Sequence, residues 1–199
     1  MTAASVTPAL VVGLGNPGDR YTQTRHNAGF WFVDELARRY GGSFRSERKF
    51  QGELAEIEVA GRRCLLLKPM TFMNRSGQSV AAAGRFYKLA PEAILVAHDE
   101  IDLPPGQVKL KQGGGHGGHN GLRDLIQAGG SRDFWRLRLG VGHPGHKDMV
   151  VNYVLNRPSA SEQPLIDQTI ELAVDVFPLI LDGHWGKAQQ RLHSFKPED

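Results

Sequence analysis

Short runs of apolar residues alternate along this chain with segments in which apolar residues recur at helical spacing. Runs of the first kind, which have the length and composition of buried strands, occur at 9–12, 64–67 and 94–97. Segments of the second kind occur at 30–40, 80–87 and 161–182. Glycines or prolines stand at the borders of most of them, where chains commonly turn. Strands that alternate with helices predict an α/β fold.

Strict alternation of apolar and polar residues adds further strands to this pattern. Ala55, Ile57 and Val59 alternate with glutamates, and Gly61-Arg62 turns this strand into the run 64–67, which predicts a hairpin. The same period occurs at 108–111 and 137–141. We therefore expect a three-layer α/β/α arrangement, in which helices flank a twisted mixed β-sheet.

The remaining segments are assigned by their composition and by helix signals. The first helix should end at Gly41-Gly42, and another should open near Leu122 with Asn120 or Gly121 at its cap. Pro178 is expected to bend or end the long helix 161–182. Short helices are predicted at 147–155 and 186–193, an exposed basic loop at 43–52 and a flexible tail at 1–8.

Length and composition narrow the classes of protein that fit. The 199 residues carry no repeat or linker, so one domain over 1–199 is expected. Cys64 is the only cysteine, which excludes an internal disulfide and suits a reducing cytoplasm. No run of 18 apolar residues and no basic segment followed by an apolar core occurs, so we expect no membrane span and no export. The net charge of +3 permits a polyanionic partner without requiring one.

Polar side chains follow several predicted strands where these strands end. Asn16 follows the first strand, Asn74 the run 64–67, and Asp99 the run 94–97. His26 lies just before or in the first turn of the first helix, and Asn120 lies in the glycine-rich run 113–121. Each of these residues taken alone is also typical of a turn or a helix cap. Open α/β folds place their sites at the carboxyl ends of strands, and this favours a shared site.

The residue types at these strand ends favour hydrolysis by an activated water. No Gly-x-Ser-x-Gly turn occurs, so a serine nucleophile is not supported. The unperturbed pKa of histidine suits a general base near neutral pH, and a carboxylate behind the ring fixes its tautomer. His26 and Asp99 can supply this pair. Asparagines offer both a donor and an acceptor without charge, and can hold a peptide group and a water.

Other functions compete with this interpretation. Gly13-x-Gly15-x-x-Gly18 matches the spacing of a dinucleotide-binding fingerprint, but Pro17 and the polar stretch 19–25 delay the helix that should meet the pyrophosphate. Two histidine pairs could bind a metal, but flexible loops hold ligands poorly, and we expect no metal; these pairs are His116-x-x-His119 and His143-x-x-His146. A non-catalytic RNA-binding module stays a third possibility.

Basic residues on two strands are suited to contact phosphates. Lys109 and Lys111 face the same side of a strand, about 7 Å apart at a rise of about 3.3 Å per residue. Arg136 and Arg138 alternate with apolar residues in a later strand. The basic faces of these two strands could be neighbours in the sheet.

The chain resembles the bacterial-type peptidyl-tRNA hydrolases in long motifs that occur in the same order. These motifs are Val12-Gly13-Leu14-Gly15-Asn16-Pro17-Gly18, Tyr21 with Thr24-Arg25-His26-Asn27, Lys68 to Gly77, His98-Asp99-Glu100, Gly113 to Leu122, and Arg136 to Gly145. The likeness covers residues 9–195, and it implies a cytoplasmic, monomeric esterase without a cofactor. Such an enzyme cleaves the ester between a peptide and the 3′ ribose of tRNA.

The resemblance also implies roles for individual residues. By position, His26 corresponds to the catalytic base of the family and Asp99 to the carboxylate that orients it. Asn16, Asn74 and Asn120 resemble the residues that position the peptide and the water, while Tyr21 and Met73 are expected to line the cleft. Lys111 and Arg138, with Lys109 nearby, correspond to a clamp on the 5′-phosphate of tRNA. The implied partner is peptidyl-tRNA, contacted at its acceptor stem and its peptide.

Overall fold

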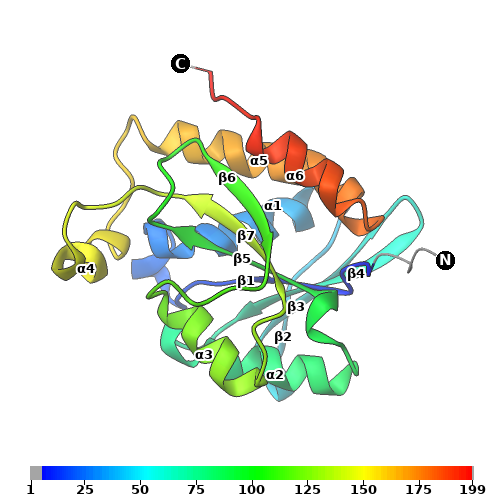
Figure 1. The fold of residues 1–199 in the computed structure, drawn as a ribbon. Coiled ribbons are helices and arrows are strands. Elements are labelled where there is room, and N and C mark those ends of the chain that lie inside the picture. Colours follow the sequence, from blue (N-terminus) through cyan, green and yellow to red (C-terminus); the bar gives the residue numbers. More distant parts are fainter. Residues whose placement is uncertain (1–5, 199) are drawn as a thin grey trace.

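The computed structural model describes residues 6–198, in which strands and helices follow one another along the chain (Figure 1). The strands are β1 (Leu10–Gly13), β2 (Arg45–Glu47), β3 (Gly52–Val59), β4 (Arg62–Pro69), β5 (Ile94–Glu100), β6 (Val108–Gln112) and β7 (Trp135–Gly140). The helices are α1 (Ala28–Tyr40), α2 (Ser76–Phe86), α3 (Asn120–Gly129), α4 (Val150–Val154), α5 (Gln163–Leu181) and α6 (Trp185–His193).

The strands form one mixed sheet in the order β2-β3-β4-β1-β5-β7-β6. The central strands β4, β1, β5 and β7 are parallel to one another, while β2, β3 and β6 pair antiparallel with their neighbours. Helices α1, α5 and α6 cover one face, and α2 and α3 cover the other (Figure 1). Successive residues of β1 point into opposite core layers, Val11 into the first and Val12 into the second. The predicted α/β/α fold is confirmed.

One prediction about the strands was wrong. Residues 43–52 are not a loop, because Arg45–Glu47 pairs antiparallel with β3 and forms the edge strand β2. The strand is short and charged, as sheet edges often are, and buried Phe50 follows it. Pro178 was expected to bend or end the long helix; it does not end α5, which continues to Leu181.

The start of the described chain is held against the rest of the protein. Trp185 Nε1 donates a hydrogen bond of 2.7 Å to the carbonyl of Val6, which is part of the predicted tail. Residues 1–5 of that tail lie outside the described residues. Cys64 is buried as expected, and burial raises the pKa of its thiol to about 12. Among residues 6–198, no helix is both long enough and apolar enough to cross a membrane.

The glycines after β1 allow α1 to pack directly against the strand. A Cβ on Gly13 would lie 2.3 Å from the carbonyl oxygen of Gly29 in α1, and a Cβ on Gly15 would lie 2.7 Å from the ring of Phe30. Glycine is needed wherever two backbones approach this closely. Two glycines of the spacing that matches a dinucleotide fingerprint are therefore explained by strand–helix packing, and the third, Gly18, has a positive φ of 104°. This contact also fixes His26, which precedes α1, beside the loop that carries Asn16.

Gly29→Ala is expected to lower the free energy of unfolding by about 3 kcal/mol. Its Cβ would lie 2.4 Å from the carbonyl oxygen of Ala97 and 2.5 Å from the amide nitrogen of Leu14, and neither backbone can move easily. Chemical denaturation measures the change. Gly186→Ala in α6 is the matched control, because a Cβ there meets nothing within 4 Å and should stabilise the helix slightly. Equal stability of the two variants would contradict the packing argument.

Candidate active site

A cavity of about 550 Å³ lies where β1 and β5 end, and it contains most of the predicted site residues. Its polar lining comprises Asn16, His26, Asn74, Arg75, Asp99, Glu100, His119 and Asn120. Its apolar lining includes Phe72, Met73, Ile101, Val150, Val151, Val154 and Leu155. We call this cavity the catalytic cleft. The parallel β1 and β5 bring their carboxyl ends to the same edge of the sheet, as the sequence argument required.

His26 and Asp99 form a buried pair at the base of the catalytic cleft. His26 lies in a 3-10 helix, Arg25–Asn27, directly before α1, and Asp99 lies near the end of β5. Their side chains are almost covered, with 8% of His26 and 3% of Asp99 exposed. His26 Nδ1 is 3.0 Å from both carboxylate oxygens of Asp99. An ionised carboxylate can only accept, so Nδ1 carries the proton and Nε2 is left as a base.

The pair has shifted pKa values with a clear physical cause. Burial lowers the pKa of His26, but the charge of Asp99 and its hydrogen bond raise it more, so the net pKa lies above the ordinary 6.5. Burial alone would raise the pKa of Asp99, yet the two imidazoles beside it hold that pKa well below its usual range. Asp99 therefore stays ionised, and its charge makes the imidazole of His26 a stronger base.

His119 is a third member of this group, and sequence reasoning considered it only as a possible metal ligand. Its Nε2 is 2.9 Å from Oδ1 of Asp99, and its ring centroid is 5.0 Å from that of His26. Its Nδ1 accepts from the backbone N–H of Gly121 at 3.1 Å and of Leu122 at 3.3 Å. Because Nδ1 accepts, Nε2 carries the proton and donates it to Asp99.

The cap of α3 was predicted one or two residues too late. His119 is the cap residue, whereas the prediction named Asn120 or Gly121. The signal was its place between a glycine-rich run and an apolar helix, but a histidine cap is less common than an asparagine cap. One side chain thus both starts a helix and contacts the carboxylate that pairs with His26.

Asn16 is held rigidly at the edge of the cleft by Asn27, a residue that the sequence argument left without a role. Asn27 Oδ1 accepts from the backbone N–H of Asn16 at 2.9 Å, and its Nδ2 donates to the carbonyl of Asn16 at 3.0 Å. The side-chain Oδ1 of Asn16 accepts from the N–H of Met73 at 2.7 Å. Within residues 6–198, Nδ2 of Asn16 has no hydrogen-bond partner, and it is accessible from the cleft.

The other predicted cleft residues lie at different depths. Met73 is buried below Asn16, while Asn74 and Asn120 are exposed in the lining. Asn120 Oδ1 accepts from Arg123 at 3.3 Å, which leaves its amide nitrogen for other partners. Tyr21 is half-buried under the guanidinium of Arg20 and does not line the cleft. The structure thus brings the asparagines to His26, but not Tyr21.

Exposed apolar side chains form one wall of the catalytic cleft. Phe72 is 60% exposed and Val151 is 64% exposed, and Leu155 lies beside them. Large apolar side chains gathered at a cavity commonly mark a binding surface. Phe72 precedes α2, and Val151 belongs to α4, so two separate segments supply this wall. The sequence pattern marked neither residue for the site.

A second, more basic cavity of about 300 Å³ adjoins the cleft and shares Glu100 and Gly117 with it. Lys111, Arg136 and Arg138 line it, and we call it the basic pocket. The predicted pairing of the basic strands is confirmed, since Lys109 lies opposite Arg138 and Lys111 opposite Arg136. Arg138 Nε donates to Glu100 at 2.8 Å. Lys109 is exposed but does not line the pocket.

The histidine pairs considered for metal binding do not come together. In the described part of the chain, the one group of His, Cys, Asp or Glu that could hold a metal is His26, Asp99 and His119, with ligand atoms within 4.8 Å of one another. His143 and His146 are both exposed and belong to neither cavity. Of the four histidines in the two pairs considered for metal binding, only His119 belongs to that group.

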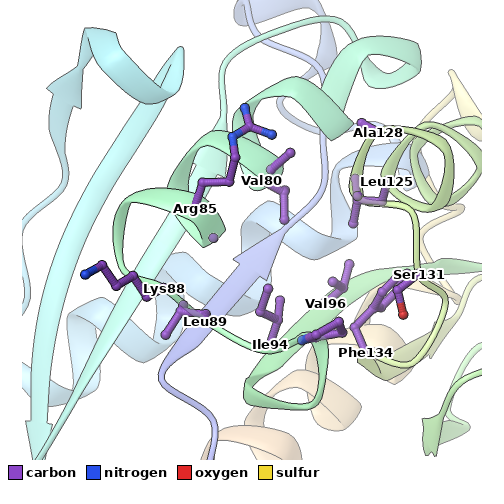
Figure 2. Close-up of a pocket in the computed structure, with 14 residues that line it drawn as sticks. Val80, Arg85, Lys88, Leu89, Ile94, Val96, Leu125, Ala128, Ser131 and Phe134 are labelled. Atoms are coloured by element: carbon purple, nitrogen blue, oxygen red, sulfur yellow. The ribbon is translucent and has the colours of Figure 1, made fainter.

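A further cavity of about 410 Å³ lies between α2, α3 and the sheet, away from these residues (Figure 2). Its wall is mostly apolar, with Val80, Leu125 and Phe134 among its residues. Lys88 points away from Leu125 and Ala128 in Figure 2. No carboxylate, imidazole or thiol lines this cavity, so it offers no general base.

Comparison with known proteins agrees with the motifs and the fold. The peptidyl-tRNA hydrolase family model matches residues 10–199. A peptidyl-tRNA hydrolase of Alkalilimnicola ehrlichii is 58% identical over 195 residues, which cover 98% of this chain and 99% of that protein. One of Halorhodospira halophila is 60% identical over 185 residues, which cover 93% and 95%. The crystal structure of peptidyl-tRNA hydrolase from Acinetobacter baumannii superposes with a TM-score of 0.94 at 47% identity and covers all of both chains. The chain belongs to the peptidyl-tRNA hydrolase family.

Proposed function

We propose that this protein hydrolyses the ester between a peptide and the 3′ ribose of tRNA with water activated by His26. The observation that carries this proposal is the buried His26–Asp99 pair, whose free Nε2 faces a cleft lined by asparagine amides. Nε2 takes a proton from water while the oxygen of that water attacks the ester carbonyl. The imidazolium then returns the proton to the ribose oxygen as the ester bond breaks, which yields a peptide acid and free tRNA.

The surrounding side chains fit the other demands of this reaction. Asp99 keeps the proton on Nδ1 of His26 and stabilises the imidazolium that forms. Nδ2 of Asn16 and the amides of Asn74 and Asn120 can donate to peptide or ester oxygens. The apolar wall at Phe72 and Val151 can cover side chains of the peptide. These are protein groups alone, so the proposed chemistry uses no metal and no cofactor.

The basic pocket is suited to a phosphate of the tRNA. Lys111 is exposed in its lining, and Arg138 directs one guanidinium edge to Glu100, which leaves its other donors for a ligand. A few placed cations are enough to hold an RNA that is read through its phosphates. The positive charge of Lys109, which lies two residues before Lys111 on β6, can also attract the phosphate.

Lys111→Ala is expected to lower kcat/KM for N-acetylated aminoacyl-tRNA by about tenfold, mainly through KM. For a short RNA ester without a 5′-phosphate, kcat/KM should fall much less, because that substrate cannot make the contact that the substitution removes. Steady-state kinetics on both substrates measure the difference. Lys187→Ala in α6 serves as a control for the loss of one exposed lysine charge. Equal losses on the two substrates would contradict a phosphate contact.

Hydrolysis of N-acetylated against free aminoacyl-tRNA tests the function itself. The blocked ester should be cleaved efficiently, since it resembles a peptide at the point where the asparagines act, and the free ester should be cleaved poorly. Salt-dependent binding of tRNA without ester cleavage would instead indicate an RNA-binding module.

The organisation of the enzyme is part of the same proposal. Every group used above comes from one chain, so we propose that residues 1–199 act as a single domain and as a monomer. Sedimentation at the concentrations used for kinetics tests the oligomeric state. A substrate made in translation would place the activity in the cytoplasm.

A further inference from the structure

Arg136 is a buried arginine whose position the proposed chemistry does not yet explain. It is the second residue of β7, and only 3% of the residue is exposed. Arg138, two residues away on the same strand, is half-buried and pairs with Glu100, but within residues 6–198 Arg136 has no carboxylate partner. Burying an unpaired guanidinium is unfavourable unless its donors are satisfied. The partners that Arg136 does have are therefore informative.

The guanidinium of Arg136 is held by backbone carbonyls of a glycine-rich segment. Nη1 donates to the carbonyl of Gly115, and Nη2 donates to the carbonyls of Gly114 and, at 3.3 Å, Arg132. The group also lies 4.6 Å above the ring of Phe134. Burial, followed by the charges of Arg132 and Arg138, lowers the pKa of Arg136 to about 10. The side chain is still a cation at neutral pH, and hydrogen bonds from a cation are stronger than those from a neutral donor.

The segment that Arg136 holds, residues 113–118, connects the two functional parts of the site, and we call it the glycine loop. Four of its glycines have positive φ, namely Gly113, Gly114, Gly117 and Gly118. Such a loop has many accessible conformations when it is not held. It begins directly after β6, which carries Lys111, and it ends at His119. Apart from the hydrogen bond of Gly113 to the carbonyl of Phe134, just before β7, its early part is fixed mainly by Arg136.

We propose that Arg136 is a positioning residue that fixes the glycine loop so that His119 stays bonded to Asp99. The inference rests on the proposed function, since it concerns the same His26–Asp99 pair. Without the guanidinium, the carbonyls of Gly114 and Gly115 accept hydrogen bonds from water instead. The glycine loop is then no longer fixed, and His119 is no longer held in position to donate to the carboxylate of Asp99. Displacing a group by about 1 Å is enough to reduce a reaction about 100-fold. Arg136 thus acts on the reaction through His119 and does not touch the substrate.

Kinetics with two substrates separate this role from a direct phosphate contact. Arg136→Gln is expected to lower kcat about 30-fold both on N-acetylated aminoacyl-tRNA and on a short RNA ester without a 5′-phosphate. Arg136→Lys keeps the charge and one donor, and it should recover at least a third of the lost kcat. Arg132→Gln removes an exposed arginine at the same end of β7 and should leave the short ester unaffected. A loss restricted to the phosphate-bearing substrate would overturn the proposal.

A spectroscopic measurement follows His119 without relying on turnover. In the native protein, long-range ¹H–¹⁵N spectra of the imidazoles should show His119 as the Nε2–H tautomer. Arg136→Gln should give a mixture of tautomers for His119, while the indole signal of Trp185 on the other face stays unchanged. An unchanged His119 signal would overturn the proposal, and so would failure of both variants to fold, which would make Arg136 a residue of the core.

Combination with a second substitution tests the route of the effect. If Arg136 acts through His119, Arg136→Gln should reduce kcat by less than threefold when it is added to His119→Ala. If the two substitutions instead lowered kcat independently, so that their fold losses multiplied in the double variant, a route through His119 would be contradicted. If the native protein cleaves no peptidyl-tRNA ester, the proposed function fails, but the tautomer of His119 still decides whether Arg136 positions the glycine loop.

Discussion

His26→Ala is expected to lower kcat for N-acetylated aminoacyl-tRNA by about a thousandfold while tRNA binding changes little. The substitution removes the imidazole whose Nε2 is the proposed base, while Nδ1 is bonded to Asp99. The basic pocket lies on other strands and is not touched, so affinity for the tRNA should survive. Single-turnover kinetics and a binding assay with the inactive variant measure the two properties separately.

The pH profile of the native enzyme adds a second check on His26. The base must be unprotonated to act, so kcat/KM should fall as the pH drops through the pKa of His26. That pKa is raised above 6.5, and the acid limb should therefore lie above 6.5. His184→Ala replaces an exposed histidine before α6, and it should change neither the rate nor the pH at which the acid limb lies. Turnover of His26→Ala within tenfold of the native rate would show that another group is the base.

Asp99→Asn should lower kcat by a few hundredfold and move the acid limb of the profile to lower pH. The carboxylate accepts hydrogen bonds from both His26 and His119, whereas an amide turns an N–H₂ group toward one of them. One imidazole then takes the wrong tautomer. The charge and the hydrogen bond of Asp99 raise the pKa of His26, so their loss leaves burial, which lowers that pKa.

The direction of this shift distinguishes an electrostatic role for Asp99 from a purely structural one. Loss of structure would reduce the rate at every pH and leave the position of the limb unchanged. Asp182→Asn, which removes an exposed carboxylate that pairs with Arg62, is the matched control and should behave like the native enzyme. A limb that stays in place or moves to higher pH in Asp99→Asn would contradict the mechanism.

The convergence of Asn16, His26 and Asp99 could be predicted from the sequence because strand ends are local and periodic features. An apolar run that stops at a polar residue marks the end of a buried strand, and parallel strands place such ends together. The same logic identified the basic faces of β6 and β7, which prove to be neighbours. These predictions needed only the period of the pattern and the topology of an α/β fold.

Residues whose roles depend on a distant partner could not be predicted in this way. His119 and Asn27 are ordinary turn residues until their partners Asp99 and Asn16 are known. Arg136 has the same spacing as Arg138, but one is buried under a loop and the other pairs with Glu100. The edge strand β2 could not be predicted either, because its sequence shows no alternation of apolar and polar residues. Its pairing with β3 is made by backbone groups, which every residue carries.

The backbone contact between β1 and α1 limits where this enzyme can be altered by protein engineering. Gly13 and Gly29 approach so closely that no side chain can be exchanged there to shift His26 relative to Asn16. The apolar wall is different, since Phe72 and Val151 are largely exposed. Libraries intended to change the accepted peptides should therefore vary the wall and leave the strand–helix contact unchanged.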